Sequence, residues 1–155
     1  MISLHRAFIG ASIAWAAALP LATLGASRPH HGSPVYLFTL AVYGIGSAVC
    51  HQLPARSFHL WAAQMPVCAR CTGIYAGAAV AAIVMSTSFD RRLRHDNPRM
   101  VVALAALPTA ATLVYEWSTG VTPSNWIRAV AGACLGAAVA IVVLVHPPER
   151  VREVN

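Results

Sequence analysis

Charged residues are scarce in this chain: they make up 10% of its 155 residues, and lysine is absent. A soluble domain typically carries about 25% charged residues, so this chain lacks the charge needed to cover a surface in contact with water. Hydrophobic residues instead reach 57%. This composition excludes a soluble globular domain, a disordered chain and a coiled coil. It indicates an integral membrane protein that is surrounded by a lipid bilayer.

Cysteine and acidic residues are also few. Four cysteines are too few for a disulfide scaffold, and the length allows a single membrane domain, 1–155. Five acidic residues face eleven arginines, which gives a net charge of +6. The arginines lie between apolar runs and not on one amphipathic surface, so they do not predict binding to nucleic acid.

Five apolar segments each approach the ~20 residues that a helix needs to cross a bilayer. We therefore predict an all-α fold, a transmembrane helical bundle of about five spans, with no strand pattern. Prolines inside the first and fourth segments predict kinks. The first segment could instead be a cleaved signal peptide, but its apolar stretch is longer than the usual ~7–15 residues. The predicted spans are 8–25, 35–50, 67–86, 100–117 and 127–146.

The distribution of arginine predicts the orientation of these spans. Five spans place the first loop, the loop 89–99 and the carboxyl-terminal tail on one side, with seven of the eleven arginines. Because Arg and Lys are enriched in cytoplasmic loops, we predict a cytoplasmic C-terminus. The amino terminus and the loops 51–66 and 118–126 would then face outward.

The densest polar stretches, 50–59 and 66–75, contain three of the four cysteines at two helix ends on the same membrane face. Cysteines three apart on a helix share one side, and a Cys₃His set suits tetrahedral zinc. Adjacent cysteine and histidine can both ligate only if the backbone leaves the helix, which Pro54 favours. We predict a metal site, with zinc as the ion, at the outer membrane face. Its ligands would be Cys50, His51, Cys68 and Cys71.

Two other interpretations of the cysteines stay open. They are small apolar residues that pack well in a core. They could also form a redox thiol pair or a disulfide, since Arg70 between Cys68 and Cys71 would favour the reactive thiolate. The sequence lacks the second Cys-x-x-Cys of a typical zinc site. Cys134 fits a packing residue better than a reserve ligand.

The polar residues near the cysteines suggest a second group. Residues 56–64 are predicted to form a short interfacial helix between spans two and three. This helix is either an anchor with its aromatic side chains at the headgroup level, or it presents Arg56 and His59 as a binding surface above the cysteines. Glu116 is the only acid near a span, and Arg128 lies on the same face, so the two are expected to pair. A role of Glu116 in proton handling or substrate binding is the alternative. The predicted second shell or binding surface is Arg56, His59, Arg70, Glu116 and Arg128.

Two small-residue motifs predict close helix packing. Such Gly-x-x-x-Gly faces allow backbones to approach, so we expect the third and fifth spans to meet there. The histidines in loops or at helix ends look solvated and lack metal-ligand spacing. The motif glycines are Gly73, Gly77, Gly132 and Gly136, and these histidines are His30, His31, His95 and His146.

The stretches Cys-His-Gln-Leu-Pro-Ala-Arg-Ser-Phe (50–58) and Cys-Ala-Arg-Cys-Thr-Gly-Ile-Tyr-Ala-Gly (68–77) resemble the domain of unknown function 2085 family, which consists of small prokaryotic multi-pass membrane proteins. The resemblance extends over about 35–145. It implies the prokaryotic cell (inner) membrane and supplies no reaction. Where we expect an Asp-Gly pair, this chain has Glu116-Trp117. The resemblance marks one unit, Cys50, His51, Arg56, Cys68, Arg70 and Cys71.

Three functions compete at this point. The first is a metal-binding membrane protein whose ion fastens the second helix to the third. The second is a membrane thiol–disulfide oxidoreductase, although such enzymes usually need a second thiol pair. The third is a non-catalytic accessory subunit that partners other membrane subunits in a larger complex. Whether the site is structural or catalytic is open from the sequence.

Overall fold

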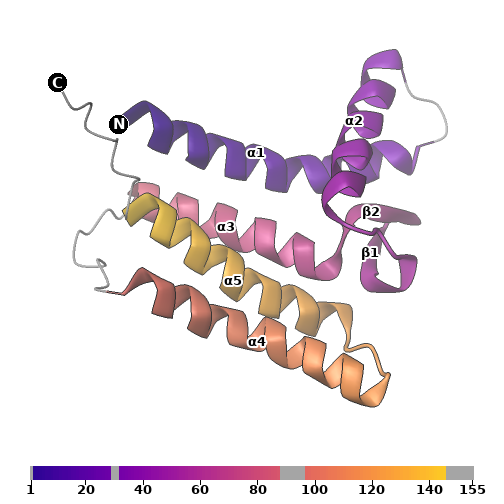
Figure 1. Cartoon of the computed structure of the whole chain (residues 1–155). Helices are drawn as coiled ribbons and strands as arrows, with labels where there is room; N and C mark the ends of the chain where they lie inside the picture. Colours follow the sequence, from indigo (N-terminus) through magenta and orange to yellow (C-terminus); the bar gives the residue numbers. More distant parts are fainter. Residues whose placement is uncertain (1, 29–31, 88–96, 146–155) are drawn as a thin grey trace.

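The computed structural model describes residues 2–28, 32–87 and 97–145, and five α-helices account for most of this part of the chain. The all-α membrane-bundle prediction is therefore confirmed (Figure 1). The predicted solvated histidines and the arginines of 91–94 and of the tail lie outside the described residues. In chain order the elements are α1 (Ile2–Ala26), α2 (Ser33–Val49), a short 3-10 turn (Pro54–Arg56), β1 (Ser57–Leu60), β2 (Ala63–Cys68), α3 (Ala69–Thr87), α4 (Pro98–Thr119) and α5 (Asn125–Val145).

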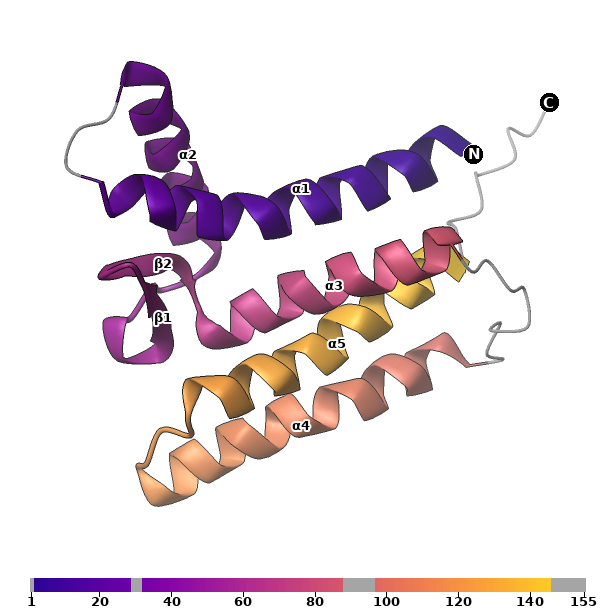
Figure 2. The ribbon, with the colours of Figure 1, turned by 180° about the vertical axis from the view of Figure 1, so that it is seen from behind.

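Four of the helices, α1, α3, α4 and α5, are long and apolar enough to cross a membrane. The helix α2 is shorter, with 17 residues. Figures 1 and 2 both show α2 lying across the direction of the other four helices. All five predicted segments are thus helical, but only four of them run along the bundle. The helices α1 and α4 continue through Pro20 and Pro108.

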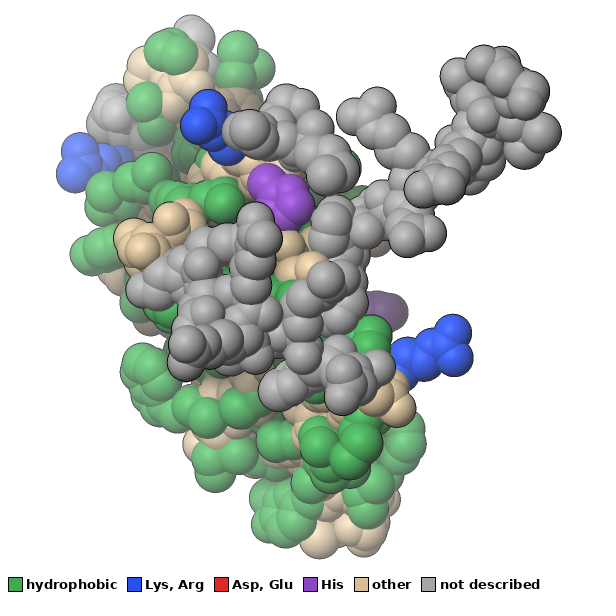
Figure 3. Space-filling view, turned by 90° about the vertical axis from the view of Figure 1, so that its left-hand side faces the viewer, with side chains coloured by type: hydrophobic (Ala, Val, Ile, Leu, Met, Phe, Trp, Pro, Cys, Tyr) green, Lys and Arg blue, Asp and Glu red, His purple; other side chains and the backbone are tan. Residues whose placement is uncertain are grey.

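Because α2 lies across the bundle, the amino-terminal end of α1 lies beside the carboxyl-terminal end of α5. The side chain of His5 in α1 lies 2.7 Å, through its Nε2 atom, from the carbonyl oxygen of Leu144 in α5. Figure 3 views this end, where basic side chains lie among apolar ones. The prediction that the amino terminus shares a membrane face with 51–66 is therefore wrong. The physical reason is that α2 does not run back along the bundle. The end of α1 and the start of α3 therefore lie at the same end of the bundle as the hairpin, and the start of α1 lies at the other end (Figure 1).

The helices α3 and α5 form the most extensive helix contact of the bundle. A Cβ atom on Gly73 would collide with the backbone of Ala129, and one on Gly136 would collide with the backbone of Ile74. The same holds for Gly77 against α5. The predicted packing of the third and fifth spans through small residues is confirmed, because only glycine allows these backbones to touch.

Residues 57–68 form an antiparallel hairpin, in which His59 pairs with Gln64. The prediction of an interfacial helix over 56–64 is wrong. A helix would leave Met65 and Val67 without the core contacts that β2 gives them, since both are buried. Pro66 also disfavours a helical conformation at the residue before it.

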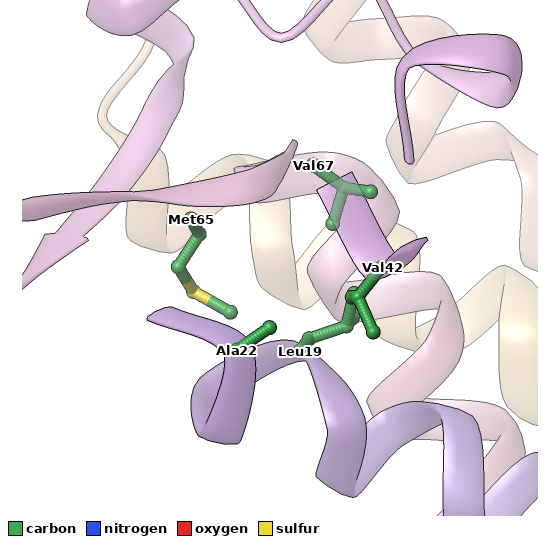
Figure 4. Packing of buried hydrophobic residues seen from close by; sticks show 5 residues of the cluster. All are labelled: Leu19, Ala22, Val42, Met65 and Val67. Atoms are coloured by element: carbon green, nitrogen blue, oxygen red, sulfur yellow. The ribbon is translucent and has the colours of Figure 1, made fainter. Parts of the chain in front are cut away.

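The core next to the site lies where α1, α2 and β2 meet (Figure 4). Partly buried side chains, including those of Cys50 and Cys71, pack against it. This core holds the end of α2 beside the start of α3, which is the arrangement that the site requires. Its buried members are Leu19, Ala22, Val42, Met65 and Val67.

Candidate metal centre

The three clustered cysteines come from three different elements. Cys50 is the residue at which α2 ends, and its extended backbone (φ −148°, ψ 138°) takes the chain out of the helix. Cys68 is the last residue of β2, and Cys71 lies in the first turn of α3. The hairpin thus returns the chain to the end of α2, so that residues 18 apart in sequence become neighbours.

The sulfur atoms of Cys50, Cys68 and Cys71 all lie within 4.8 Å of one another. All three are free thiols of intermediate burial, and the backbone N–H of Cys68 donates to the Cys50 Sγ at 3.2 Å. Zinc–sulfur bonds of ~2.3 Å in a tetrahedron place ligand sulfurs roughly 3.5–4 Å apart. The spacing therefore suits one ion bound by three thiolates after a small adjustment.

His51 and Cys134 lie outside this trio. The extended backbone at Cys50 directs successive side chains to opposite sides, and His51 is exposed. It nevertheless lines the same cavity as the sulfurs. Cys134 is exposed on α5. The structure thus assembles three of the four predicted ligands, and the role of His51 stays a prediction.

The surroundings of Cys68 stabilise its thiolate. A hydrogen bond with the thiol of Cys71 lowers the pKa of Cys68 to about 5, although burial acts in the opposite direction. The backbone N–H of Cys71, the Cys50 side chain and the positive charge of Arg128 also lower it. Thiolate is the form of cysteine that binds metals and attacks disulfides, so the environment favours both chemistries.

The three sulfurs open into a cavity of about 400 Å³. Arginine is prominent in its wall, where Arg56, Arg70 and Arg128 contribute from the hairpin region, α3 and α5. Of the predicted second group, His59 is exposed on β1 and does not line this cavity. The cavity therefore joins thiols and guanidinium groups in one space.

The carboxylate of Glu116 pairs with Arg56 and not with Arg128, so the predicted Glu116–Arg128 pair is wrong. The guanidinium of Arg128, whose residue is 1% exposed, lies under the hairpin. There it donates to the carbonyl of Arg56 and to the side chain of Asn125, each at 3.4 Å. The hairpin brings Arg56 over α4, a position that the predicted helix over 56–64 does not provide.

Gln52 is a positioning residue that sequence reasoning missed. Its backbone has φ 48°, and its side-chain amide donates to the carbonyls of Tyr43 (3.0 Å) and Pro66 (2.7 Å). In return, the amide of Gln64 donates to the Gln52 carbonyl at 2.5 Å. These bonds tie the end of α2 to β2 beside the cysteines. Gln52 follows Cys50 and His51 directly in the sequence, but glutamine is not a typical zinc ligand, so the motif alone does not indicate its role.

Two contacts between elements also emerged only in the structure. Asn125, at the start of α5, donates from its side chain to the carbonyl of Ser57 at 3.0 Å. Arg70 donates to the hydroxyl of Thr112 on α4 at 3.1 Å. Together they attach α4 and α5 to the site, and no spacing in the sequence relates these residues.

Residues 50–142 match the family model described as "Predicted membrane protein (DUF2085)". This match covers more than half of the chain and begins at Cys50. The chain belongs to this family. The matched part of the DUF2085 protein contains the three clustered cysteines, the helices α3 and α4, and most of α5. The family match therefore includes both the candidate metal centre and the contact between α3 and α5 through glycines.

Two archaeal proteins described as uncharacterized are similar to shorter parts of the chain. One, from Methanocaldococcus jannaschii, is 46% identical over 46 residues, which is 30% of this chain and 30% of that protein. The other, from Methanothermobacter thermautotrophicus, is 53% identical over 30 residues, or 19% of this chain and 27% of that protein. The chain thus spans less than a third of the length of these relatives. No solved structure matches it with significant similarity.

Proposed function

We propose that this DUF2085 protein binds a thiophilic metal ion, with zinc the leading choice, through Cys50, Cys68 and Cys71. The observation that carries the proposal is the convergence of three sulfurs, from α2, β2 and α3, within 4.8 Å. Cysteines that merely fill space in a core have no reason to meet at one point from three elements. Thiolate ligands are those that structural zinc sites use most.

In this proposal the ion fastens the end of α2 and the hairpin to the start of α3. The family match includes all three ligands, which supports their acting as a unit. His51, which lines the same cavity, would supply the fourth ligand, or a water molecule would take its place. The centre would lie at the outer face of a prokaryotic cell membrane, because fewer arginines flank this end of the bundle.

Elemental analysis of protein purified without chelator, with a count of free thiols, tests the metal site. We expect about one zinc per chain in the wild type, because one tetrahedral site uses the three thiolates. Cys68→Ser should lose the metal. Cys134→Ser is the matched control, since it removes an exposed thiol outside the trio and should keep the metal. Metal-free wild-type protein, or equal metal content in both variants, would overturn the proposal.

Thiol–disulfide exchange is a second candidate, favoured by the same convergence. Two thiols of the trio could release two protons and two electrons to an acceptor, such as a quinone or an external disulfide, and form one disulfide. With an external disulfide, one thiol of the pair attacks to form a mixed disulfide and releases one thiol, and the other attacks the mixed disulfide and releases the second thiol; Cys50 is the candidate for this resolving thiol. Metal-free protein that reversibly gains and loses one disulfide within the trio would support this candidate over the metal centre. Metal-loaded protein with the trio fully reduced would count against it.

A further inference from the structure

The cavity beside the cysteines is lined by more positive charge than the described residues neutralise. Three guanidinium groups line it, and the one ion pair among the described residues joins Arg56 to Glu116. Arg70 and Arg128 therefore have no carboxylate partner within the parts of the chain that the structure describes. Unpaired arginines are ordinary on a water-exposed surface, but Arg128 is buried and Arg70 is half-buried at the start of α3.

Burial makes this excess of charge significant. Arg128 is 1% exposed, and the Nε atoms of both Arg70 and Arg128 are buried without a hydrogen-bond partner among the described residues. Their remaining bonds go to neutral acceptors, the hydroxyl of Thr112 and the oxygens of Arg56 and Asn125. Neutral acceptors do not compensate a buried charge, and an uncompensated buried charge strongly destabilises a fold. A negative group in the cavity would supply the missing partner.

The excess does not depend on the proposed metal. Without a metal, Glu116 and the Cys68 thiolate offset two of the three arginines, which leaves one positive charge in excess around the cavity. With a divalent ion on three thiolates, one positive charge remains in excess. The need for an anion therefore persists whether or not the metal proposal holds.

We propose that this cavity binds a phosphate group between the guanidiniums of Arg70 and Arg128. Guanidinium forks match phosphate oxygens and form strong, charge-assisted hydrogen bonds with them. The arginines approach from α3, α5 and the hairpin region, an arrangement that suits a tetrahedral oxyanion better than a planar carboxylate. The cavity, at about 400 Å³, leaves room for the rest of a molecule that carries the phosphate.

The phosphate could belong to a soluble compound or to a lipid headgroup at the end of the bundle. Thermal unfolding in a phosphate-free maltoside detergent distinguishes the two sources. One arm adds inorganic phosphate, with acetate at equal ionic strength as its control. The other arm adds phosphatidylglycerol to the micelles, with diacylglycerol, which lacks the phosphate, as its control. Both arms are run on metal-loaded and chelator-treated protein.

The variants test whether the binding belongs to the cavity. Arg70→Gln removes one cavity guanidinium, and Arg28→Gln removes the same charge from an exposed residue that does not line the cavity. We expect phosphate or phosphatidylglycerol to raise the melting temperature of wild type and Arg28→Gln. Binding to Arg70→Gln should be at least about tenfold weaker, as expected for one lost charge-assisted bond. If Arg70→Gln fails to fold, Arg70→Lys, which keeps the charge but loses the fork, should show the same weakening.

Three results would overturn the proposal: no stabilisation of wild type by either phosphate source, equal stabilisation by acetate, or equal binding by Arg70→Gln and Arg28→Gln. Loss of binding on removal of the metal would also overturn it, because the anion would then be a ligand of the ion. Phosphate binding by a protein that never holds metal would leave this inference standing and defeat the proposed function alone.

Discussion

At the scale of single residues, the ion pair between Arg56 and Glu116 joins two groups of unequal exposure. The side chain of Arg56 is 39% exposed, and that of Glu116 is 6% exposed. One carboxylate oxygen of Glu116 is buried without a hydrogen-bond partner in the described part of the chain. Removing the arginine therefore strands a buried charge, whereas removing the acid leaves a guanidinium that can turn toward water.

We predict that Arg56→Gln destabilises the protein more than Glu116→Gln. The first change should cost about 3 kcal/mol, because an unpaired buried charge bears its full desolvation penalty. The second should cost about 1 kcal/mol, as for the loss of a half-exposed ion pair. Thermal unfolding in detergent measures both, and the double variant should cost less than Arg56→Gln alone. Equal losses in the two single variants would contradict this account.

At the scale of elements, the hairpin turns through residues that do not favour its geometry. Trp61 and Ala62 both have positive φ, of 51° and 63°. Two-residue hairpin connections with two positive φ angles ordinarily use Asn and Gly, since other residues lose energy in that region. Trp61 and Ala62 therefore give no turn signal in the sequence, and without one the pattern over 56–64 predicts a helix.

Ala62→Gly should stabilise the protein by about 0.5–1 kcal/mol, because glycine adopts positive φ without strain and this outweighs its entropy cost. Ala63→Gly, one residue later in β2, should destabilise it by roughly 0.5–1 kcal/mol, since the backbone there is ordinary strand. The two neighbouring substitutions should thus shift the melting temperature in opposite directions. A loss of stability in both would argue against the turn.

The glycine contact between α3 and α5 supports a second prediction at this scale. Gly77→Leu and Gly136→Leu should each cost more than about 3 kcal/mol, because overpacking at a backbone contact forces the helices apart. Gly10→Leu is the control, since a Cβ at Gly10 meets nothing within 4 Å. Thermal stability in detergent should fall sharply for the first two and little for the control. Wild-type stability of all three would refute the contact.

At the scale of the whole molecule, the number of crossing helices determines which segments share a membrane face. With α2 lying across the bundle, the start of α1 and the end of α5 lie at one end and the cysteines at the other. Seven arginines belong to segments that attach to the end away from the cysteines, namely Arg6, Arg91, Arg92, Arg94, Arg99, Arg150 and Arg152. The cytoplasmic preference of arginine therefore again favours a cytoplasmic connection between α3 and α4.

Labelling of intact cells with a membrane-impermeant thiol reagent tests this orientation in a cysteine-free background. Cysteine at position 93 or position 4 should be protected, and cysteine at position 118, near the end of α4, should react. Five crossing helices would instead make position 4 reactive, so this site separates the two arrangements. Ready labelling at position 93 would reject both.

Local properties of the chain account for what the sequence predicted correctly. A membrane helix depends on its own length and apolar composition, so all five helices could be found without tertiary information. Linked helix ends must lie near each other, which is why the spacing of Cys50, Cys68 and Cys71 predicted their meeting. The glycine motifs predicted the contact of α3 with α5 for a similar reason, since only small residues allow such an approach.

The tertiary structure alone decided the direction of α2, the hairpin and the partner of Glu116. Each of these depends on contacts between residues distant in sequence, where several alternatives have similar local preferences. Met65 and Val67 become buried only when β2 meets α1 and α2. That packing holds the hairpin in place, and the hairpin in turn brings Arg56 to Glu116. Arg128 is left buried, with no acidic partner within salt-bridge distance among the described residues. Composition can therefore specify which segments enter the membrane, whereas the charge pattern around the cysteines arises only once the elements have packed.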